Sequence, residues 1–179
     1  MPDLWGYADI HCHPMAHLAF GGQHASAPGR GLLWGTTRGP LRDALPCCSP
    51  GHVGYFSGQG LLPAISDSYH GEGFPSFRSW PRHDSTLHQQ MHLHWTRRAF
   101  ESGLRLMVAI AVNNEMLANL AMGAHLDNSD AASIAAQVAD MKATIAENAS
   151  WMALALDPDE ARAAIAAGKH VHSEKPLAI

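Results

Sequence analysis

The sequence predicts an α/β fold made of about four parallel β/α units, with a long loop after the first strand. Three observations support this prediction. A strand pattern opens the chain at residues 7–13, apolar runs recur at 104–112 and 151–156, and helix signals separate these strands. Alternation of this kind gives parallel strands joined by right-handed crossovers. We therefore expect a parallel sheet with helices packed on it.

Residues 20–82, which follow the first strand, are rich in Gly, Pro and Ser. Loops of this length inside a compact domain are uncommon, and most of them are functional lids or disordered segments. Because aromatic side chains recur along this stretch, we expect it to pack over the rest of the chain. The sequence thus predicts a single domain over residues 1–179, with 20–82 as an irregular insertion on its active face.

The first predicted helix precedes the second strand. Apolar side chains recur every four residues from Leu87 to Ala99 and predict a helical stripe. Thr86 resembles the first residue of a capping box, and Gly103 is typical of a helix end. The continuous apolar run at 104–112 then indicates a parallel strand covered on both faces.

Two helices are expected between the second and third strands. Asn113 or Asn114 can cap a short helix that runs through Met122. Ser129 can cap a longer helix, whose buried apolar stripe is expected to begin at Ile134 and to continue at intervals of four, three and four residues.

The last helix has the clearest local signal in the chain. Asp157 stands at the cap position, Pro158 at the first helical position and Glu160 at the third. This helix is expected to end at Gly168, and residues 169–173 then predict a short fourth strand.

The composition excludes several classes of partner. Hydrophobic residues make up 46% of the chain, and the formal net charge of −4 offers no electrostatic basis for binding nucleic acid or an anionic membrane. The chain shows neither a signal-peptide pattern nor an apolar run as long as a membrane span, so a cytoplasmic protein with a small-molecule substrate is expected. The three cysteines do not form a disulfide framework.

The first strand contains the sequence His11-Cys-His13. Side chains two residues apart on a strand point the same way, so we expect both imidazoles to face one direction together with Asp9, while Ile10 and Cys12 pack on the other side. Two imidazoles placed in this way can bind one metal ion. Alternatively, they line the wet side of a half-exposed strand.

Other histidines are weaker candidates. His17 can reach the same metal if the chain turns helical after His13. His88 and His92 are four residues apart on the predicted helix and could bind metal together, but a solvated outer face is the simpler interpretation.

The His-Cys-His strand, followed by Pro14-Met-Ala-His-Leu-Ala-Phe-Gly-Gly22, resembles the amidohydrolase superfamily of metal-dependent hydrolases and, more loosely, the membrane-dipeptidase-like hydrolases. The resemblance extends over about residues 5–165. It implies a TIM-type (β/α) barrel whose first strand supplies two ligands to a divalent metal, most commonly zinc. Those positions are His11 and His13 in this sequence.

A complete barrel of this type needs about 250 residues, so the chain is expected to form a truncated barrel. The implied activity is hydrolysis of a C–N or C–O bond in an amide, dipeptide, ester or lactone through a metal-activated water. Glu174 is the candidate bridging carboxylate or general base. A half-barrel would leave its first and fourth strands unpaired, which favours a homo-oligomer through these exposed edges.

The segment Ala166-Ala-Gly-Lys-His-Val-His-Ser-Glu-Lys-Pro-Leu-Ala178 resembles part of the glucose-fructose oxidoreductase and inositol dehydrogenase family. In that family the lysine corresponding to Lys175 lies near the nicotinamide. The family also needs a Gly-rich phosphate turn after its first strand, and no Gly-x-Gly-x-x-Gly occurs in this chain. Two alternatives to the hydrolase therefore remain, an inactive barrel fragment or binding module and a fragment of an NAD(P)-dependent oxidoreductase.

Overall fold

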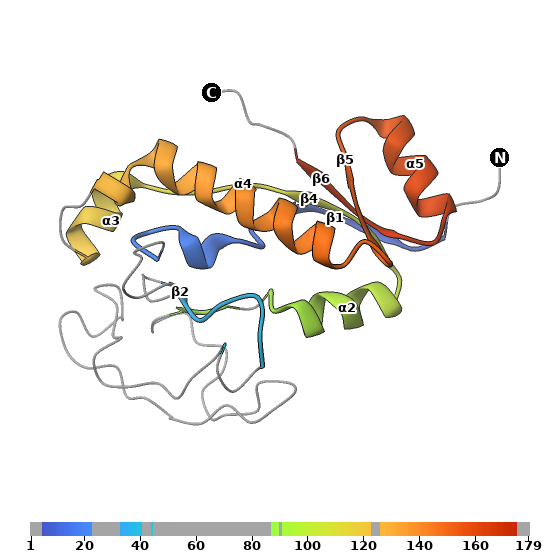
Figure 1. Ribbon diagram of the computed structural model, residues 1–179, viewed down its shortest axis with the longest axis horizontal. Coiled ribbons are helices and arrows are strands. Elements are labelled where there is room, and N and C mark those ends of the chain that lie inside the picture. The colour runs from blue at the N-terminus through green and yellow to red at the C-terminus, as the bar shows by residue number, and fades with distance from the viewer. Residues whose placement is uncertain are drawn as a thin grey trace.

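The computed structural model (Figure 1) describes residues 5–22, 33–40, 44, 87–89, 91–122 and 126–174. In these residues it confirms an α/β fold with a parallel sheet and helices packed on it. Most of the predicted insertion at 20–82 lies outside the described residues.

Four strands form the main sheet, and all neighbouring strands in it are parallel. In chain order they are β1 (Tyr7–Cys12), β4 (Leu104–Ala109), β5 (Met152–Ala155) and β6 (His170–Glu174). Across the sheet the order is β1-β4-β6-β5, so the last strand lies in the interior of the sheet. A smaller parallel pair joins β2 (Leu33–Trp34) to β3 (Leu87–His88).

This strand order differs from that of a barrel segment. In a TIM-type barrel each β/α unit adds one strand beside the previous one. Here β6 lies between β4 and β5, and the edges of the sheet are β1 and β5. The expectation that the fourth strand forms an edge is therefore wrong. The structure shows a four-stranded parallel α/β sheet, and the barrel stays a prediction.

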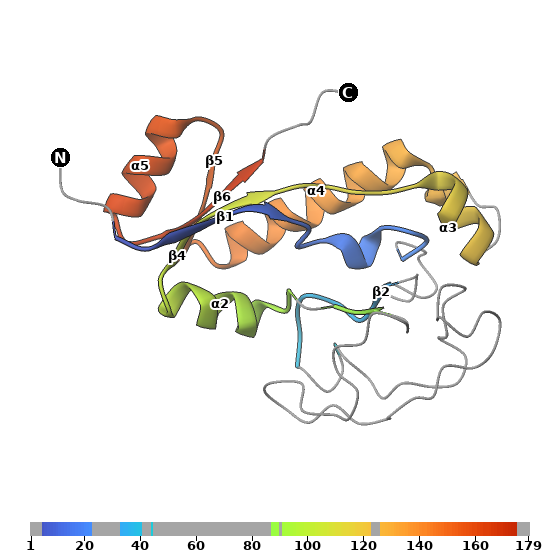
Figure 2. The ribbon, with the colours of Figure 1, turned by 180° about the vertical axis from the view of Figure 1, so that it is seen from behind.

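The connections carry four α-helices in the described part of the chain: α2 (Leu93–Glu101), α3 (Glu115–Met122), α4 (Asp130–Glu147) and α5 (Pro158–Ala166). Two short 3-10 helices are η1 (Ala16–Leu18) and η3 (Leu126–Asn128). Helices α2 and α5 lie on opposite sides of the sheet in both views (Figures 1 and 2). Over the residues described, no helix has both the length and the apolar character needed to span a membrane.

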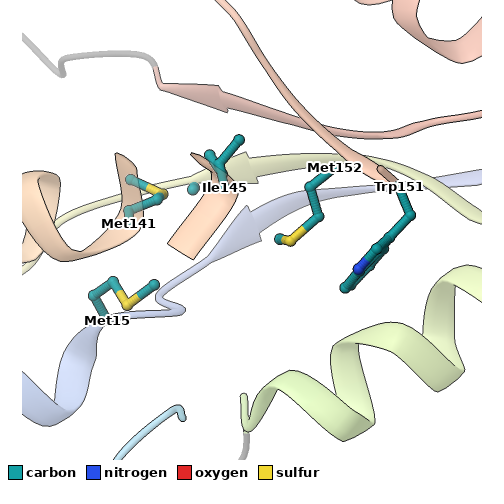
Figure 3. Close-up of a cluster of buried hydrophobic side chains, with 6 residues drawn as sticks. Met15, Met141, Ile145, Trp151 and Met152 are labelled. Carbon is teal, nitrogen blue, oxygen red and sulfur yellow. The ribbon is translucent and has the colours of Figure 1, made fainter. Parts of the chain in front are cut away.

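The main core cluster lies where the sheet meets α2 and α4. Leu93 and Phe100 of α2 pack against it. Its buried side chains, most of which are labelled in Figure 3, are Met15, Ala109, Met141, Ile145, Trp151 and Met152. Three of these six are methionines, whose unbranched thioethers fill irregular space between a sheet and two helices.

The capping signals predicted for the later helices are confirmed. Asp157 Oδ1 accepts hydrogen bonds from the backbone N–H groups of Asp159 and Glu160 at 2.9 and 2.8 Å. Ser129 caps α4 in the same way. Asn114 Oδ1 accepts from a backbone N–H in the first turn of α3 at 2.9 Å. Local sequence therefore placed these three helix starts correctly.

The predicted start of the first helix is wrong. Leu87 and His88 belong to β3, and α2 begins only at Leu93. Its cap is His92, whose Nδ1 accepts a hydrogen bond from the backbone N–H of His94 at 3.2 Å, while Nε2 lies 3.0 Å from a backbone carbonyl. His92 is buried, so the solvated outer face expected for it is wrong as well.

Candidate functional site

The rings of His11 and His13 converge at the carboxyl end of β1. Their Nε2 atoms are 3.1 Å apart, and the ring planes cross at 82°. Two nitrogens bound to one tetrahedral zinc lie about 3.3 Å apart, because each Zn–N bond measures about 2.0–2.1 Å. The two imidazoles thus already stand at a separation suited to one shared ion.

A backbone carbonyl selects the tautomer of His13. Nδ1 of His13 lies 3.0 Å from the carbonyl oxygen of Ile110. A carbonyl can only accept, so Nδ1 carries the hydrogen and the neutral ring keeps its lone pair on Nε2. Nε2–H of His11 then donates to His13. Histidines that bind metals are usually oriented by a carbonyl or carboxylate on the other ring nitrogen, and His13 has this support.

The strand beneath the histidines is irregular. Its register with β4 shifts between Asp9 and Cys12, and the exposed fraction of Ile10 is 74%. The expectation that Ile10 packs inside is therefore wrong. The Asp9 carboxylate interacts with the Cys12 thiol as well as with His11. Strict alternation would place Ile10 and Cys12 on the same face, but after the shift in register Ile10 is exposed whereas Cys12 is buried.

The Asp9 carboxylate is already engaged by its neighbours. Besides the Cys12 thiol it accepts the backbone N–H of His11 at 3.1 Å. These two hydrogen bonds lower the pKa of Asp9, the one from the thiol more strongly. Burial, reinforced by the adjacent carboxylate, raises the pKa of the Cys12 thiol to about 12. The thiol stays protonated at neutral pH, so Cys12 is not prepared to act as a metal ligand or nucleophile.

His17 lies in the interior behind this site. The chain does turn helical after His13, but η1 directs His17 inward, where its exposed fraction is 3%. Gln89 Nε2 donates to His17 Nδ1 at 3.1 Å. Burial, together with the charge of Arg38, lowers the pKa of His17 to about 4. The ring is thus neutral, and its 3.8 Å approach to Asp140 is not an ion pair at neutral pH. We assign His17 a structural role.

Asn113 holds the loops around the site together. Its Oδ1 accepts the backbone N–H of Phe20, in the segment after β1, at 2.8 Å. Its Nδ2 donates to the carbonyl of Asn128 and to the carboxylate of Asp130, both at 2.9 Å. The loops that leave β1 and β4 are therefore fixed relative to the start of α4.

Glu174 is the last residue of β6 and is level with the end of β1, the strand that carries His11. Its Cα is paired with Ala109 of β4, which is itself paired with Cys12 of β1. Neighbouring strands are about 4.8 Å apart, so the Cα atoms of Glu174 and Cys12 are separated by about 10 Å. The backbone thus brings Glu174 to the carboxyl end of the sheet, where His11 and His13 also lie. Lys175 lies outside the described residues.

A second His-x-His pair stands on β6 and was not singled out from the sequence. His170 and His172 are 0% and 2% exposed, and neither ring forms a hydrogen bond. Burial lowers the pKa of His170 to about 4 and that of His172 to about 3. Nearby backbone groups of Leu104 and Arg105 counteract part of the shift at His170 without normal hydrogen-bond geometry. The sequence did contain a signal for this pair, because His170 and His172 repeat the His-x-His spacing of His11 and His13.

Within the described ranges, no group of three His, Cys, Asp or Glu side chains is arranged to hold a metal ion. Searches against protein-family models, curated proteins and solved structures found no match for the chain. The family resemblances therefore remain predictions that rest on short motifs.

Proposed function

We propose that this protein is a metal-dependent hydrolase that cleaves a C–N or C–O bond in an amide, dipeptide, ester or lactone. His11 and His13 supply two ligands to a divalent metal, with zinc as the first choice. The observation that carries the proposal is the 3.1 Å approach of their Nε2 atoms, with His13 oriented by the Ile110 carbonyl.

The position of the pair in the fold supports this proposal. Parallel α/β folds place their active sites at the carboxyl ends of the strands, in open sheets and in barrels alike. His11 and His13 lie at such an end. The site therefore needs only the parallel sheet and does not depend on the partial TIM-type barrel that the sequence resemblance implies, from which the β1-β4-β6-β5 order departs.

Each residue has a defined part in the proposed reaction. His13 offers a fixed Nε2 lone pair, whereas exposed His11 must move its hydrogen to Nδ1, which costs little in contact with solvent. A zinc ion held by the two imidazoles would supply a Lewis acid that makes water a nucleophile at neutral pH and polarises the substrate carbonyl. Glu174 is proposed as the general base, which takes a proton from the attacking water and returns it to the leaving nitrogen or oxygen.

Zinc binding by purified full-length protein tests the ligand assignment. We expect one zinc per chain in a chelator competition, with an affinity at least about tenfold lower in His11→Ala and in His13→Ala. His94→Ala is the matched control, because His94 is an exposed histidine on α2. Zinc affinity that is unchanged in both β1 variants would contradict the proposal.

Hydrolysis of a panel of dipeptides, acylated amino acids and lactones tests the role of Glu174. The variant Glu174→Gln should retain zinc and lose about 10²–10⁴-fold in hydrolysis rate, because an amide cannot accept the proton. A Glu174→Gln variant that hydrolyses at the wild-type rate would remove Glu174 from the mechanism.

A further inference from the structure

The two candidate ligands of β1 are held by different partners. His13 is fixed by the backbone of Ile110, whose carbonyl oxygen lies 3.0 Å from the ring nitrogen Nδ1. The N–H of the same residue donates to the carbonyl of Cys12 at 2.8 Å. Both contacts come from the chain that continues β4. The orientation of His13 is therefore set by the neighbouring strand.

His11 lies where β1 leaves its regular pairing with β4. Between its paired residues Asp9 and Cys12, β1 has two residues where β4 has only one. These two are Ile10 and His11, and neither is paired with a residue of β4. A bulge of this kind bends the strand and interrupts its ladder of hydrogen bonds. The sheet alone therefore does not fix the main chain at His11.

The Asp9 carboxylate supplies the contact that the sheet does not. Its Oδ1 accepts the backbone N–H of His11 at 3.1 Å. An aspartate that accepts the N–H two residues later closes a turn and restricts the main-chain angles within it. The direction in which the His11 side chain leaves the strand thus depends on Asp9.

Asp9 is itself anchored to the buried side of the strand. Its carboxylate interacts with the thiol of Cys12, a residue that is 6% exposed. Because burial raises the pKa of this thiol to about 12, the thiol keeps its hydrogen at neutral pH and can donate it. Asp9 therefore connects an exposed candidate ligand to the interior of the fold.

Asp9 also brings a negative charge to the site. The Cys12 thiol and, next, the backbone N–H of His11 lower the pKa of its carboxyl group, so the group is ionised at neutral pH. Two neutral imidazoles bring no charge to balance that of a divalent ion. A carboxylate that acts electrostatically on one of them supplies part of that balance.

We propose that Asp9 is the positioning residue of the metal site. It holds His11 so that Nε2 is directed toward the ion shared with His13, and its charge favours a divalent cation there. The inference rests on the proposed function, because it takes His11 as a ligand. Histidine ligands are usually oriented by a carbonyl or a carboxylate. The Ile110 carbonyl serves the ring of His13, and the Asp9 carboxylate serves His11 through its backbone.

Zinc affinity of full-length variants, measured by competition with a chelator, tests the assignment. Asp9→Asn keeps an oxygen acceptor and removes the charge, whereas Asp9→Ala removes both. We expect zinc affinity to fall about tenfold in Asp9→Asn and toward about 100-fold in Asp9→Ala. Asp159→Asn, at a side chain on α5 that is 93% exposed, is the matched control and should bind zinc as wild type does. Wild-type affinity in Asp9→Ala would overturn the proposal, and if that variant fails to fold, wild-type affinity in Asp9→Asn overturns it instead.

A double-mutant cycle separates the positioning of His11 from a general effect on the fold. Asp9→Ala should weaken zinc binding at least about threefold less in a His11→Ala background than in a His13→Ala background, because the first background has no ring to position. Equal losses in the two backgrounds would assign Asp9 to the stability of the fold and refute its positioning role.

The same measurements distinguish failure of this inference from failure of the proposed function. Zinc affinity that is unchanged in His11→Ala would overturn both, since His11 would then not be a ligand. Zinc affinity that falls in His11→Ala but stays at the wild-type value in both Asp9 variants would overturn the role of Asp9 alone.

Discussion

At the scale of single residues, burial decides what each histidine can do. His11 and His13 lie at the surface or near it, where their nitrogens are accessible. His17, His170 and His172 are buried, and burial is the largest cause of the low pKa of each ring. The chain contains 13 histidines, and their residue type alone does not separate these two groups.

Acid should destabilise the fold through these buried rings. The pKa of His170 is about 4 in the folded chain and about 6.5 in an unfolded one. Its stabilising contribution is thus complete above pH 6.5 and is lost as pH falls toward 4, at about 1.4 kcal/mol per pH unit. Urea unfolding at pH 7, 6 and 5 measures this slope. In His170→Phe the phenyl ring can stack on Trp151 in place of the imidazole, and we expect the slope of the unfolding free energy against pH to decrease by the contribution of one proton. The control His94→Phe, at an exposed position, should leave this slope unchanged.

At the scale of secondary structure, hydrogen bonds rather than an apolar stripe fix the first half of α4. Ile134, predicted to begin that stripe, is 41% exposed, whereas Ser133 and Gln137 are buried. Ser133 Oγ donates to the carbonyl of Leu18 at 3.2 Å. Gln137 accepts from the N–H of Val112 at 3.1 Å and donates to its carbonyl at 2.8 Å. Helix α4 therefore holds the loops after β1 and β4, which carry the candidate site.

Replacing Gln137 should be costly for this reason. In Gln137→Leu the N–H and carbonyl of half-buried Val112 lose both of their partners, so we expect the free energy of unfolding to fall by about 2 kcal/mol. Urea denaturation followed by circular dichroism measures the change. Ala135→Ser, at an exposed position of the same helix, should stay within about 0.5 kcal/mol of wild type. Equal stability of the two variants would show that the Gln137 contacts are not structural.

At the scale of the whole molecule, the candidate metal site lies on an edge strand. Strand β1 pairs only with β4 in the described part of the sheet, and its residues 7–11 are all exposed. Tyr7 and Ile10 are 51% and 74% exposed. An exposed edge strand with apolar side chains is a template for pairing with another chain. The fold thus agrees with a homo-oligomer through β1, which we retain as a prediction.

Sedimentation velocity over a concentration series tests this association. Wild-type protein should shift from monomer to dimer as its concentration rises. Ile10→Lys should weaken the dimer at least tenfold, because a lysine on an edge strand opposes pairing. Leu156→Lys is the control, because Leu156 is 66% exposed directly after the opposite edge strand, β5. A wild-type chain that remains monomeric throughout the series would contradict the prediction.

The sequence by itself determined the parallel α/β class, the later helix starts and the shared direction of His11 and His13. These features depend on residues within about four positions of one another, such as Asp157 and the N–H groups that it caps. Tertiary structure alone decided the β1-β4-β6-β5 order, the late start of α2 and the burial of His170 and His172. It also supplied the Ile110 carbonyl that orients His13. Those features depend on contacts between segments far apart in the chain, and no local spacing records which surfaces will meet.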